Sequence, residues 1–170
     1  MASVDVERTW LEMRQRPAHA PTVAPPGVRL QRATPCPPGF YRFLYGEVGR
    51  AFKWVDRLGW PDDRLAAHLA DPTVAVWVAL EGPVPLGYFE LVRHPDASVE
   101  IAYFGLMPWA IGRGLGRWLL EAAIAEAWRD GPTRIWLHTC TLDHPAALPN
   151  YLGRGFTVTH REQIVQEVPG

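Results

Sequence analysis

A turn with three glycines in five residues, placed between an apolar strand and an amphipathic helix, is the strongest constraint on this chain. Gly112, Gly114 and Gly116 follow the segment Val99–Leu106, which is rich in β-branched and aromatic residues and predicts a buried strand. After Gly114, apolar residues recur at helical spacing at Leu115, Trp118, Leu119, Ala122 and Ala123. Gly131-Pro132 ends this pattern, so a strand–turn–helix unit is predicted.

This turn has the chemistry of a phosphate site. Glycine brings the main chain close to a ligand, and the first N–H groups of the following helix have no helical partner and carry partial positive charge. Arg113 and Arg117 add full positive charges. The spacing Gly-x-Gly-x-Gly is neither the dinucleotide fingerprint nor a P-loop. From the residues alone, a plain structural turn is an equally good interpretation.

Length and charge narrow the class of protein. The 170 residues predict one domain with a substantial core, and 17 Lys+Arg against 18 Asp+Glu give no electrostatic case for nucleic acid or an anionic membrane. The N-terminus is not a secretory signal, and no apolar run is long enough to span a membrane. Cys36 and Cys140 suggest free thiols rather than a disulfide framework. A cytoplasmic protein is expected.

The remaining elements follow from periodicity and turn residues. Residues 1–27 are predicted to be an N-terminal Pro-rich extension of a domain at 28–170, with a short helix over Val4–Arg16 and an extended stretch over Pro17–Gly27. The domain is predicted to contain, in order, a strand at 28–33, helices at 40–52 and 61–70, strands at 73–80, 86–92 and 99–106, a helix at 115–130, a strand at 134–141, a helix at 145–152 and a last strand from 155.

Two segments resemble the GNAT (GCN5-related N-acetyltransferase) acyltransferases. Ile111-Gly-Arg-Gly-Leu-Gly116 takes the place of the family's Gln/Arg-x-x-Gly-x-Gly/Ala motif, with Ile111 where the family usually has Gln or Arg. Farther on, Ala147, Tyr151, Gly155 and Phe156 match a second family motif, in which His144 replaces Asn and Asn150 replaces Leu. The resemblance covers about Val28–Gln166. It implies an α/β (α+β) fold with a mixed, mostly antiparallel central sheet flanked by helices.

The resemblance implies acetyl-CoA as co-substrate. The glycine turn would bind the pyrophosphate, and the open end of the preceding strand would pair with the pantetheine amides. The residues implied in cofactor binding are Phe104, Leu106, Ile111, Gly112, Arg113, Gly114, Leu115, Gly116, Arg117 and His144.

Three side chains are candidates for proton transfer. Tyr151 matches the family tyrosine that protonates the departing thiolate, because a phenol keeps its proton at neutral pH; an aromatic packing role is the alternative. Glu100 falls where some family members keep a general base, although it could instead be exposed or paired with an arginine. Glu90 on the preceding strand is the rival base, and water would carry the proton if neither does.

The acceptor site is expected beside a tryptophan-rich loop, Lys53–Trp60. Tyr45, Trp54, Asp56, Trp60 and Glu90 are the candidate substrate-binding residues, and Asp56 could attract an ammonium group. Surface packing of the loop is an equally good interpretation. His138, Cys140, Asp143 and His144 show no recognisable metal spacing, so no metal is expected.

These observations predict an N-acetyltransferase that moves an acetyl group from acetyl-CoA to a primary amine by direct attack. A non-catalytic acyl-CoA-binding or sensory domain of the same fold is the alternative. The acceptor, a small-molecule or peptide amine, is not identified, no nucleic acid or membrane partner is expected, and a homodimer is left open.

Overall fold

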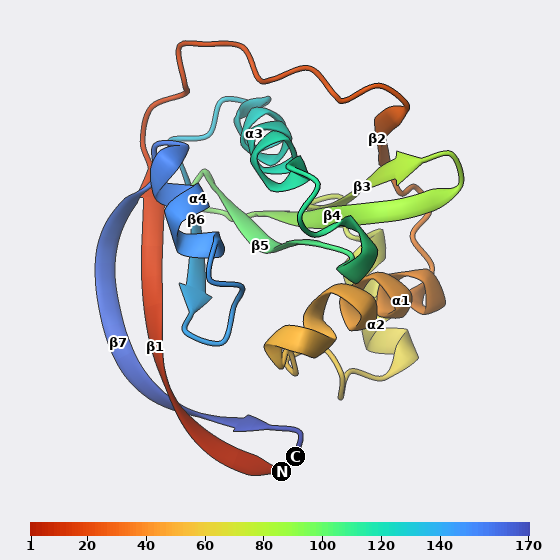
Figure 1. Ribbon diagram of the computed structural model, residues 1–170, viewed down its shortest axis with the longest axis vertical. Coiled ribbons are helices and arrows are strands. Elements are labelled where there is room, and N and C mark those ends of the chain that lie inside the picture. The colour runs from red at the N-terminus through yellow and green to blue at the C-terminus, as the bar shows by residue number, and fades with distance from the viewer.

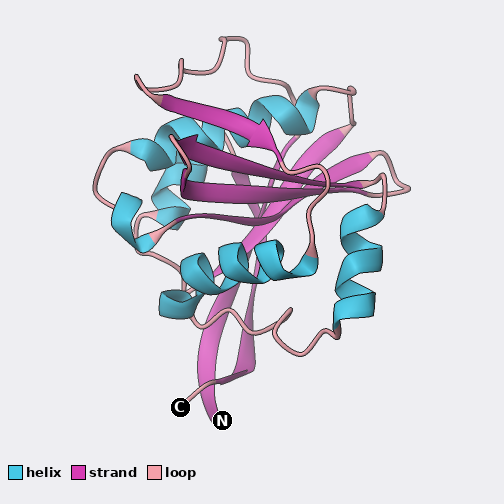
Figure 2. Cartoon of the chain, turned by 90° about the vertical axis from the view of Figure 1, so that its right-hand side faces the viewer, coloured by secondary structure: helices cyan, strands magenta, loops and turns pink.

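The computed structural model describes residues 1–170, which form a seven-stranded sheet with helices on both faces (Figures 1 and 2). The strands, in chain order, are β1 (Ala2–Met13), β2 (Val28–Arg32), β3 (Val74–Glu81), β4 (Val84–Arg93), β5 (Ser98–Leu106), β6 (Arg134–Cys140) and β7 (Thr157–Val168). The helices are α1 (Pro38–Gly49), α2 (Asp62–Ala70), α3 (Leu115–Trp128) and α4 (Ala147–Gly153), with single 3-10 turns η1 (Arg50–Phe52) and η2 (Pro108–Ala110).

The sheet order is β2-β3-β4-β5-β6-β1-β7, and every neighbouring pair is antiparallel except β5 and β6. The predicted fold class, a mixed and mostly antiparallel sheet flanked by helices, is therefore confirmed. Apart from the N-terminus, the predicted order of strands and helices also holds, with boundaries that shift by a few residues. No helix of the structure has both the length and the apolar composition needed to cross a membrane.

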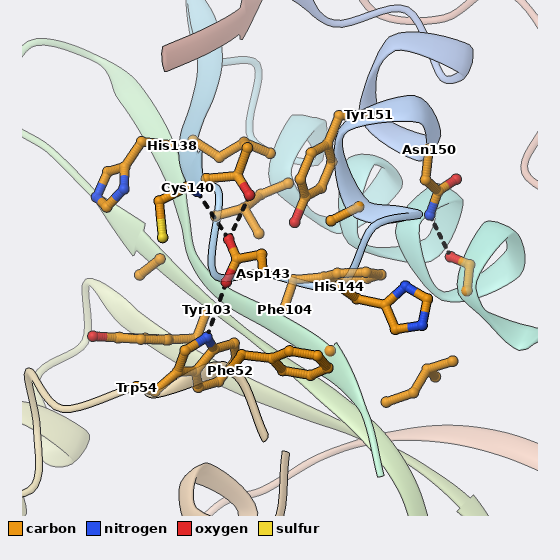
Figure 3. Close-up of a pocket in the computed structure, with 18 of the residues that line it drawn as sticks. Phe52, Trp54, Tyr103, Phe104, His138, Cys140, Asp143, His144, Asn150 and Tyr151 are labelled. Atoms are coloured by element: carbon orange, nitrogen blue, oxygen red, sulfur yellow. Dashed lines mark hydrogen bonds between the residues drawn. The ribbon is translucent and has the colours of Figure 1, made fainter. Parts of the chain in front are cut away.

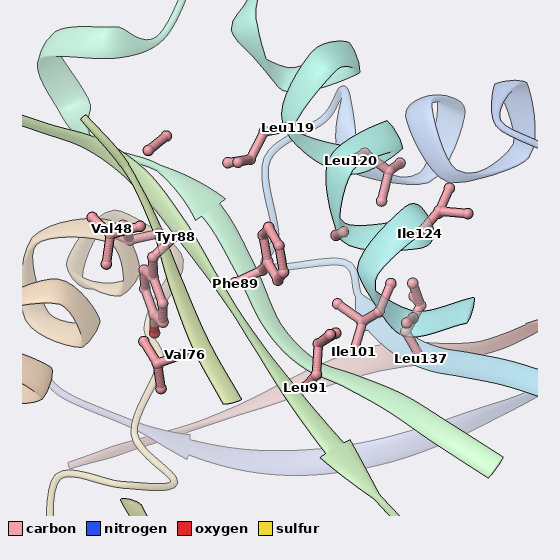
Figure 4. Close-up of a cluster of buried hydrophobic side chains, with 14 of the residues drawn as sticks. Val48, Val76, Tyr88, Phe89, Leu91, Ile101, Leu119, Leu120, Ile124 and Leu137 are labelled. Atoms are coloured by element: carbon pink, nitrogen blue, oxygen red, sulfur yellow. The ribbon is translucent and has the colours of Figure 1, made fainter. Parts of the chain in front are cut away.

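The core lies on both faces of the central strands because their side chains alternate between two helical layers (Figure 4). Tyr88 on β4 faces helix α1 and Val48, whereas the next residue, Phe89, faces helix α3 and Leu119. Both aromatic side chains are fully buried. Because both faces of β4 are buried, its sequence is a nearly continuous run of apolar residues rather than an alternation of apolar and polar ones.

The N-terminus corrects the prediction for Val4–Arg16. No helix forms there: β1 is a 12-residue strand that lies between β6 and β7 and is antiparallel to both. Leu11 and Met13 pack into the core, and Trp10 and Glu12 point to the other face. The sheet thus continues across the expected boundary at residue 27. Strand pairing with segments more than 120 residues away outweighs the weak local helix pattern.

The stretch between β1 and β2 is extended, as predicted, and passes over helix α3 to the far edge of the sheet (Figure 1). Thr22 fastens it, since both its main-chain N–H and its hydroxyl donate to the carboxylate of Glu121 on α3. This segment therefore connects β1, next to one edge strand, to β2 at the opposite edge, across the helix that follows the glycine turn.

Candidate active site

The central cavity arises where strands β5 and β6 part. They are paired only between Ser98–Glu100 and Arg134–Trp136, and beyond that point the two strands diverge. The second halves of both strands line a cavity of about 910 Å³. There, the edge of β5 that faces β6 has no strand partner, so its main-chain N–H and C=O groups are available to a ligand.

The glycine turn forms one end of this cavity. Gly112 and Gly114 have φ of +84° and +76°, a conformation that side chains other than glycine rarely adopt. A Cβ at either residue would meet nothing within 4 Å, so the space beside the turn is open. Gly114 is the N-cap of α3 with no side-chain cap, which leaves the first N–H groups of that helix free. The open turn and the helix N-terminus together fit an anion such as a pyrophosphate.

Most of the residues predicted to bind the cofactor line the cavity. They are Phe104, Leu106, Ile111, Gly112, Gly114, Leu115, Gly116, Arg117 and His144. Arg113 does not: its guanidinium donates to Glu81 on β3 at 3.0 and 3.2 Å and lies outside the cavity. Asn150, which the sequence analysis treated only as a departure from the family motif, also lines it. Its Nδ2 donates to the carbonyl of Gly116 at 3.1 Å and joins α4 to the start of α3.

Tyr151 reaches the cavity from helix α4 (Figure 3). Its ring makes edge contacts with Phe104 and Phe156, at centroid distances of 6.2 and 6.1 Å. Burial raises the pKa of the Tyr151 phenol, and the nearby Asp143 carboxylate raises it further. The phenol therefore keeps its proton at neutral pH.

Glu100 lies on the cavity wall, near the point where β5 and β6 part. Its Oε1 is 2.9 Å from Nε2 of His94, whose ring lies beside that of Trp136 at a centroid distance of 5.5 Å and a tilt of 30°. His94 lies in the turn between β4 and β5, and its side chain is 34% exposed. Glu100 is thus neither fully exposed nor paired with an arginine, and a carboxylate in this position can accept a proton from a group in the cavity.

Glu90 lies outside the cavity and is fully buried. Both of its oxygens accept hydrogen bonds from Arg57, at 3.0 and 2.9 Å; Tyr41 donates at 2.6 Å, and Nε2 of His68 is 2.9 Å away. Burial alone would raise the pKa of Glu90, but the hydrogen bonds from His68 and Arg57 outweigh it and the pKa is lowered. The expectation that Glu90 contacts substrate or acts as base is corrected: it holds Arg57.

Arg57 in turn holds the tryptophan-rich loop against the sheet. Its guanidinium lies 4.5 Å from the Trp60 ring centroid and 4.9 Å from that of Tyr103. The Tyr45 hydroxyl accepts a hydrogen bond from the Arg57 main-chain N–H at 3.2 Å. Tyr45 and Trp60 therefore lie behind the cavity and support Arg57, whereas Trp54 and Asp56, also predicted to bind substrate, line the cavity.

A contact between two distant loops crosses the cavity (Figure 3). The indole N–H of Trp54 donates to Asp143 at 3.3 Å, and Asp143 also accepts from the main-chain N–H of Cys140 and the hydroxyl of Thr139. Beside it, the Phe52 and His144 rings meet edge to face. This contact separates the end near Asn150 from the end near His138 and Tyr103. We call these the cofactor end and the acceptor end, after the ligands that the sequence analysis expects at each.

The acceptor end carries polar side chains that the sequence analysis had considered only for a metal site, or not at all. His138 lies there; its pKa is lowered by burial and by the charge of Arg8. Cys140 and Arg8 also line the cavity. No group of three or more His, Cys, Asp or Glu side chains is arranged to hold a metal ion. Arg8 could have been found only by recognising β1 as a strand beside β6.

Solved structures share this fold. A GCN5-related N-acetyltransferase from Sphaerobacter thermophilus gives a TM-score of 0.65 at 20% identity, over 95% of this chain and 50% of that chain. One from Kribbella flavida gives 0.66 at 18%, over 96% and 58%. A mutant form of spermidine N-acetyltransferase from Vibrio cholerae gives 0.60 at 20%, over 77% and 80%. The chain thus spans 50% and 58% of the lengths of the first two.

A search of curated protein sequences finds no match. The model of the acetyltransferase (GNAT) family, however, matches residues 41–156, a stretch that contains the glycine turn, Glu100 and Tyr151. Because that match covers more than half of the sequence, the chain belongs to the GNAT acetyltransferase family.

Proposed function

We propose that this protein transfers an acetyl group from acetyl-CoA to a primary amine. The observation that carries the proposal is a single cavity that joins three features: the open glycine turn at the start of α3, the unpaired edge of β5 and the phenol of Tyr151. Acyl transfer follows from family membership, and one protein of similar fold, the spermidine N-acetyltransferase, is named for an amine. Both support an amine acceptor here.

The residues of the cofactor end fit acetyl-CoA. The N–H groups of Gly112–Gly116 would hold the pyrophosphate, with Arg117 nearby as a cation. The main-chain groups of Phe104 and Leu106 on the unpaired edge of β5 would pair with the pantetheine amides. Ile111 and His144 line this end as well and would contact the same molecule. When bound, acetyl-CoA supplies an activated acyl group.

At the acceptor end, side chains of the protein would take a proton from the acceptor and give a proton to the leaving sulfur. Glu100 accepts a proton from the ammonium of the acceptor, which frees the nitrogen lone pair. The nitrogen then bonds to the acyl carbon as the carbon–sulfur bond breaks, and Tyr151 donates its phenolic proton to the sulfur. The second proton that the nitrogen loses on becoming an amide returns through water to the Tyr151 phenolate. Trp54, hydrogen-bonded to Asp143, lies across the cavity and would limit the access of water to the reacting atoms. Asp56, whose carboxylate accepts from Tyr103 at 3.4 Å, attracts the cationic acceptor to this end.

The test is CoA release from acetyl-CoA in the presence of a panel of amines, against a control without acceptor. We expect release to depend on the amine and to be accompanied by the N-acetylated product in the mass spectrum. Release that is the same with and without every amine, in protein whose melting temperature rises with acetyl-CoA, would contradict amine acetylation.

A further inference from the structure

Arg8 on β1 is a charged residue of the cavity wall that neither the family motifs nor the mechanism uses. It lies outside the stretch matched by the family model and pairs with Cys140 on β6 and Glu162 on β7. Its side chain lines the acceptor end together with Cys140 and His138. The N-terminal strand therefore brings a guanidinium to the wall of the cavity from a part of the chain remote from every other site residue.

The hydrogen-bonding capacity of this guanidinium is not used up within the protein. The Nε of Arg8 is buried and has no hydrogen-bond partner. Its ion-pair partner, Glu162, lies 3.6 Å from Nη1, beyond ordinary hydrogen-bond length, and the Glu162 side chain is 43% exposed. Arg57 is the contrast, because its guanidinium makes two short hydrogen bonds to Glu90. Because Nε is enclosed by the protein, a ligand would reach the terminal nitrogens of this guanidinium, whose side chain is 29% exposed and whose contact with Glu162 is long.

The charges around Arg8 suit a molecule with two opposite charges. Glu100 and Asp56, both acidic, line the same end of the cavity as Arg8. The His138 imidazole is close enough to all three to feel the charge of each. Arg8, Glu100 and Asp56 therefore line the cavity in the neighbourhood of His138, where an ammonium group and an anion of the same molecule can each find an opposite charge.

We propose that Arg8 binds a carboxylate of the acceptor, so that the acceptor is an amine with a carboxylate close to its amino group, as in a free amino acid. This assignment rests on the proposed acetyl transfer and names its substrate class. A guanidinium offers two parallel N–H donors that match a carboxylate. In this arrangement the amino group lies toward Glu100, and Arg8 fixes the orientation of the acceptor rather than moving a proton.

The test compares acceptors in matched pairs that differ only by the carboxylate: phenylalanine and phenethylamine, tyrosine and tyramine, lysine and cadaverine. Removing the carboxylate also changes the basicity of the amine, so wild type and Arg8→Gln are compared on each acceptor separately. We expect Arg8→Gln to lower kcat/KM for carboxylated acceptors by about ten- to a hundredfold, the span for loss of a charged hydrogen bond. For the decarboxylated amines, the change should stay within about twofold.

Arg161→Gln is the matched control. Arg161 lies on β7, its side chain is 52% exposed, it pairs with Glu7 at 3.7 Å, and it does not line the cavity. This variant should leave both members of each pair unaffected. Arg8→Lys, which keeps the charge but loses the two-pronged geometry, should fall between wild type and Arg8→Gln. All three variants should keep the rise in melting temperature with acetyl-CoA, which shows that fold and cofactor end are intact.

Three results would overturn the assignment. Equal losses on both members of a pair would make Arg8 a structural residue. Transfer to the decarboxylated amines alone, unchanged in Arg8→Gln, would overturn carboxylate recognition and leave acetyl transfer standing. No amine-dependent CoA release from any of the six acceptors would count against acetyl transfer to small amines as well as against the role of Arg8.

Discussion

The two ends of the cavity are built in opposite ways. The cofactor end consists largely of main-chain groups, the turn at Gly112–Gly116 and the edge of β5, and these come from one continuous segment. The acceptor end consists of side chains from separate elements: Arg8 on β1, Asp56 in the loop before α2, Glu100 on β5 and His138 on β6. Main-chain recognition tolerates changes of sequence, whereas side-chain recognition does not. A fold built this way can keep one cofactor and change its acceptor.

The largest loss of turnover is expected from Gly114→Glu. The change puts a carboxylate into the open space beside the turn, where a pyrophosphate would lie, and forces a side chain into a positive-φ conformation. The rise in melting temperature with acetyl-CoA, measured by thermal shift, should disappear together with activity.

Gly82→Glu is its control, because Gly82 also has a positive φ, of +56°, with open space around it, but lies in the turn between β3 and β4. That variant should keep the acetyl-CoA response. If a folded Gly114→Glu protein responds to acetyl-CoA like wild type, the glycine turn does not hold the cofactor.

The next largest loss is expected from Tyr151→Phe, which removes the proton donor and keeps the ring between Phe104 and Phe156. Turnover should fall by about ten- to a thousandfold, with little change in the acetyl-CoA response. Tyr88→Phe serves as control, since the Tyr88 hydroxyl is buried without a hydrogen-bond partner and lies outside the cavity. Turnover within a factor of two of wild type, with chemistry rate-limiting, would make Tyr151 a packing residue.

Glu100→Gln should have an effect that depends on pH. The variant keeps the shape of the side chain but cannot take a proton from the acceptor, so kcat/KM should fall by about tenfold or more on the acidic side. High pH should partly restore it, because the amine then arrives neutral. An unchanged pH profile would mean that water, and not Glu100, carries the proton.

Glu90→Gln should have the smallest effect on turnover and the largest on stability. It leaves Arg57 buried without its counter-charge, which costs about 3–5 kcal/mol. We expect a higher KM for the acceptor, because the loop of Asp56 loses its anchor, and an unchanged acetyl-CoA response. Glu81→Gln, which breaks the exposed pair with Arg113, should change stability little. A changed rise in melting temperature with acetyl-CoA, together with an unchanged KM for the acceptor, would contradict this account, because Glu90 would then act on the cofactor end instead of the acceptor end.

The pH dependence of stability gives a second test of the buried Glu90 carboxylate. Because the folded-state pKa of Glu90 is below the usual value of 4.5, its ionised form stabilises the fold at pH values above the unfolded pKa. That contribution is lost as the pH falls from about 4.5 through the folded pKa. Chemical denaturation across this range should show a steeper acid loss in wild type than in Glu90→Gln.

The contrast between a site built from one continuous segment and a site built from separate elements also explains how much could be predicted from the sequence. The strand, turn and helix of residues 99–128 and the position of Tyr151 depend on local spacing and motif register, and the structure places them as predicted. β1 could not be recognised because its partners, β6 and β7, are remote in sequence.

The sequence predicted Trp54, Asp56 and Glu100 on the cavity wall but misplaced Glu90, for a related reason. The role of Glu90 depends on which face of β4 its side chain points to, and a shift of one residue along the strand would reverse that face. The role of Arg57 follows from the position of Glu90. The sequence alone does not show that Glu90 faces α1, where Tyr41 and Arg57 enclose it. The sequence also does not show that Arg113 pairs with Glu81 on β3. That ion pair holds its guanidinium outside the cavity.

A crystal structure with acetyl-CoA bound would test the central claim most directly. The account predicts pyrophosphate oxygens within hydrogen-bond distance of the N–H groups of Gly112–Gly116, the pantetheine arm along the unpaired edge of β5 at Phe104–Leu106, and the sulfur next to the Tyr151 hydroxyl. Arg8, Asp56 and Glu100 should then face the acetyl group across a space that is free for an acceptor. A cofactor bound elsewhere, or one whose thioester points away from Tyr151, would contradict the assignment of the two ends.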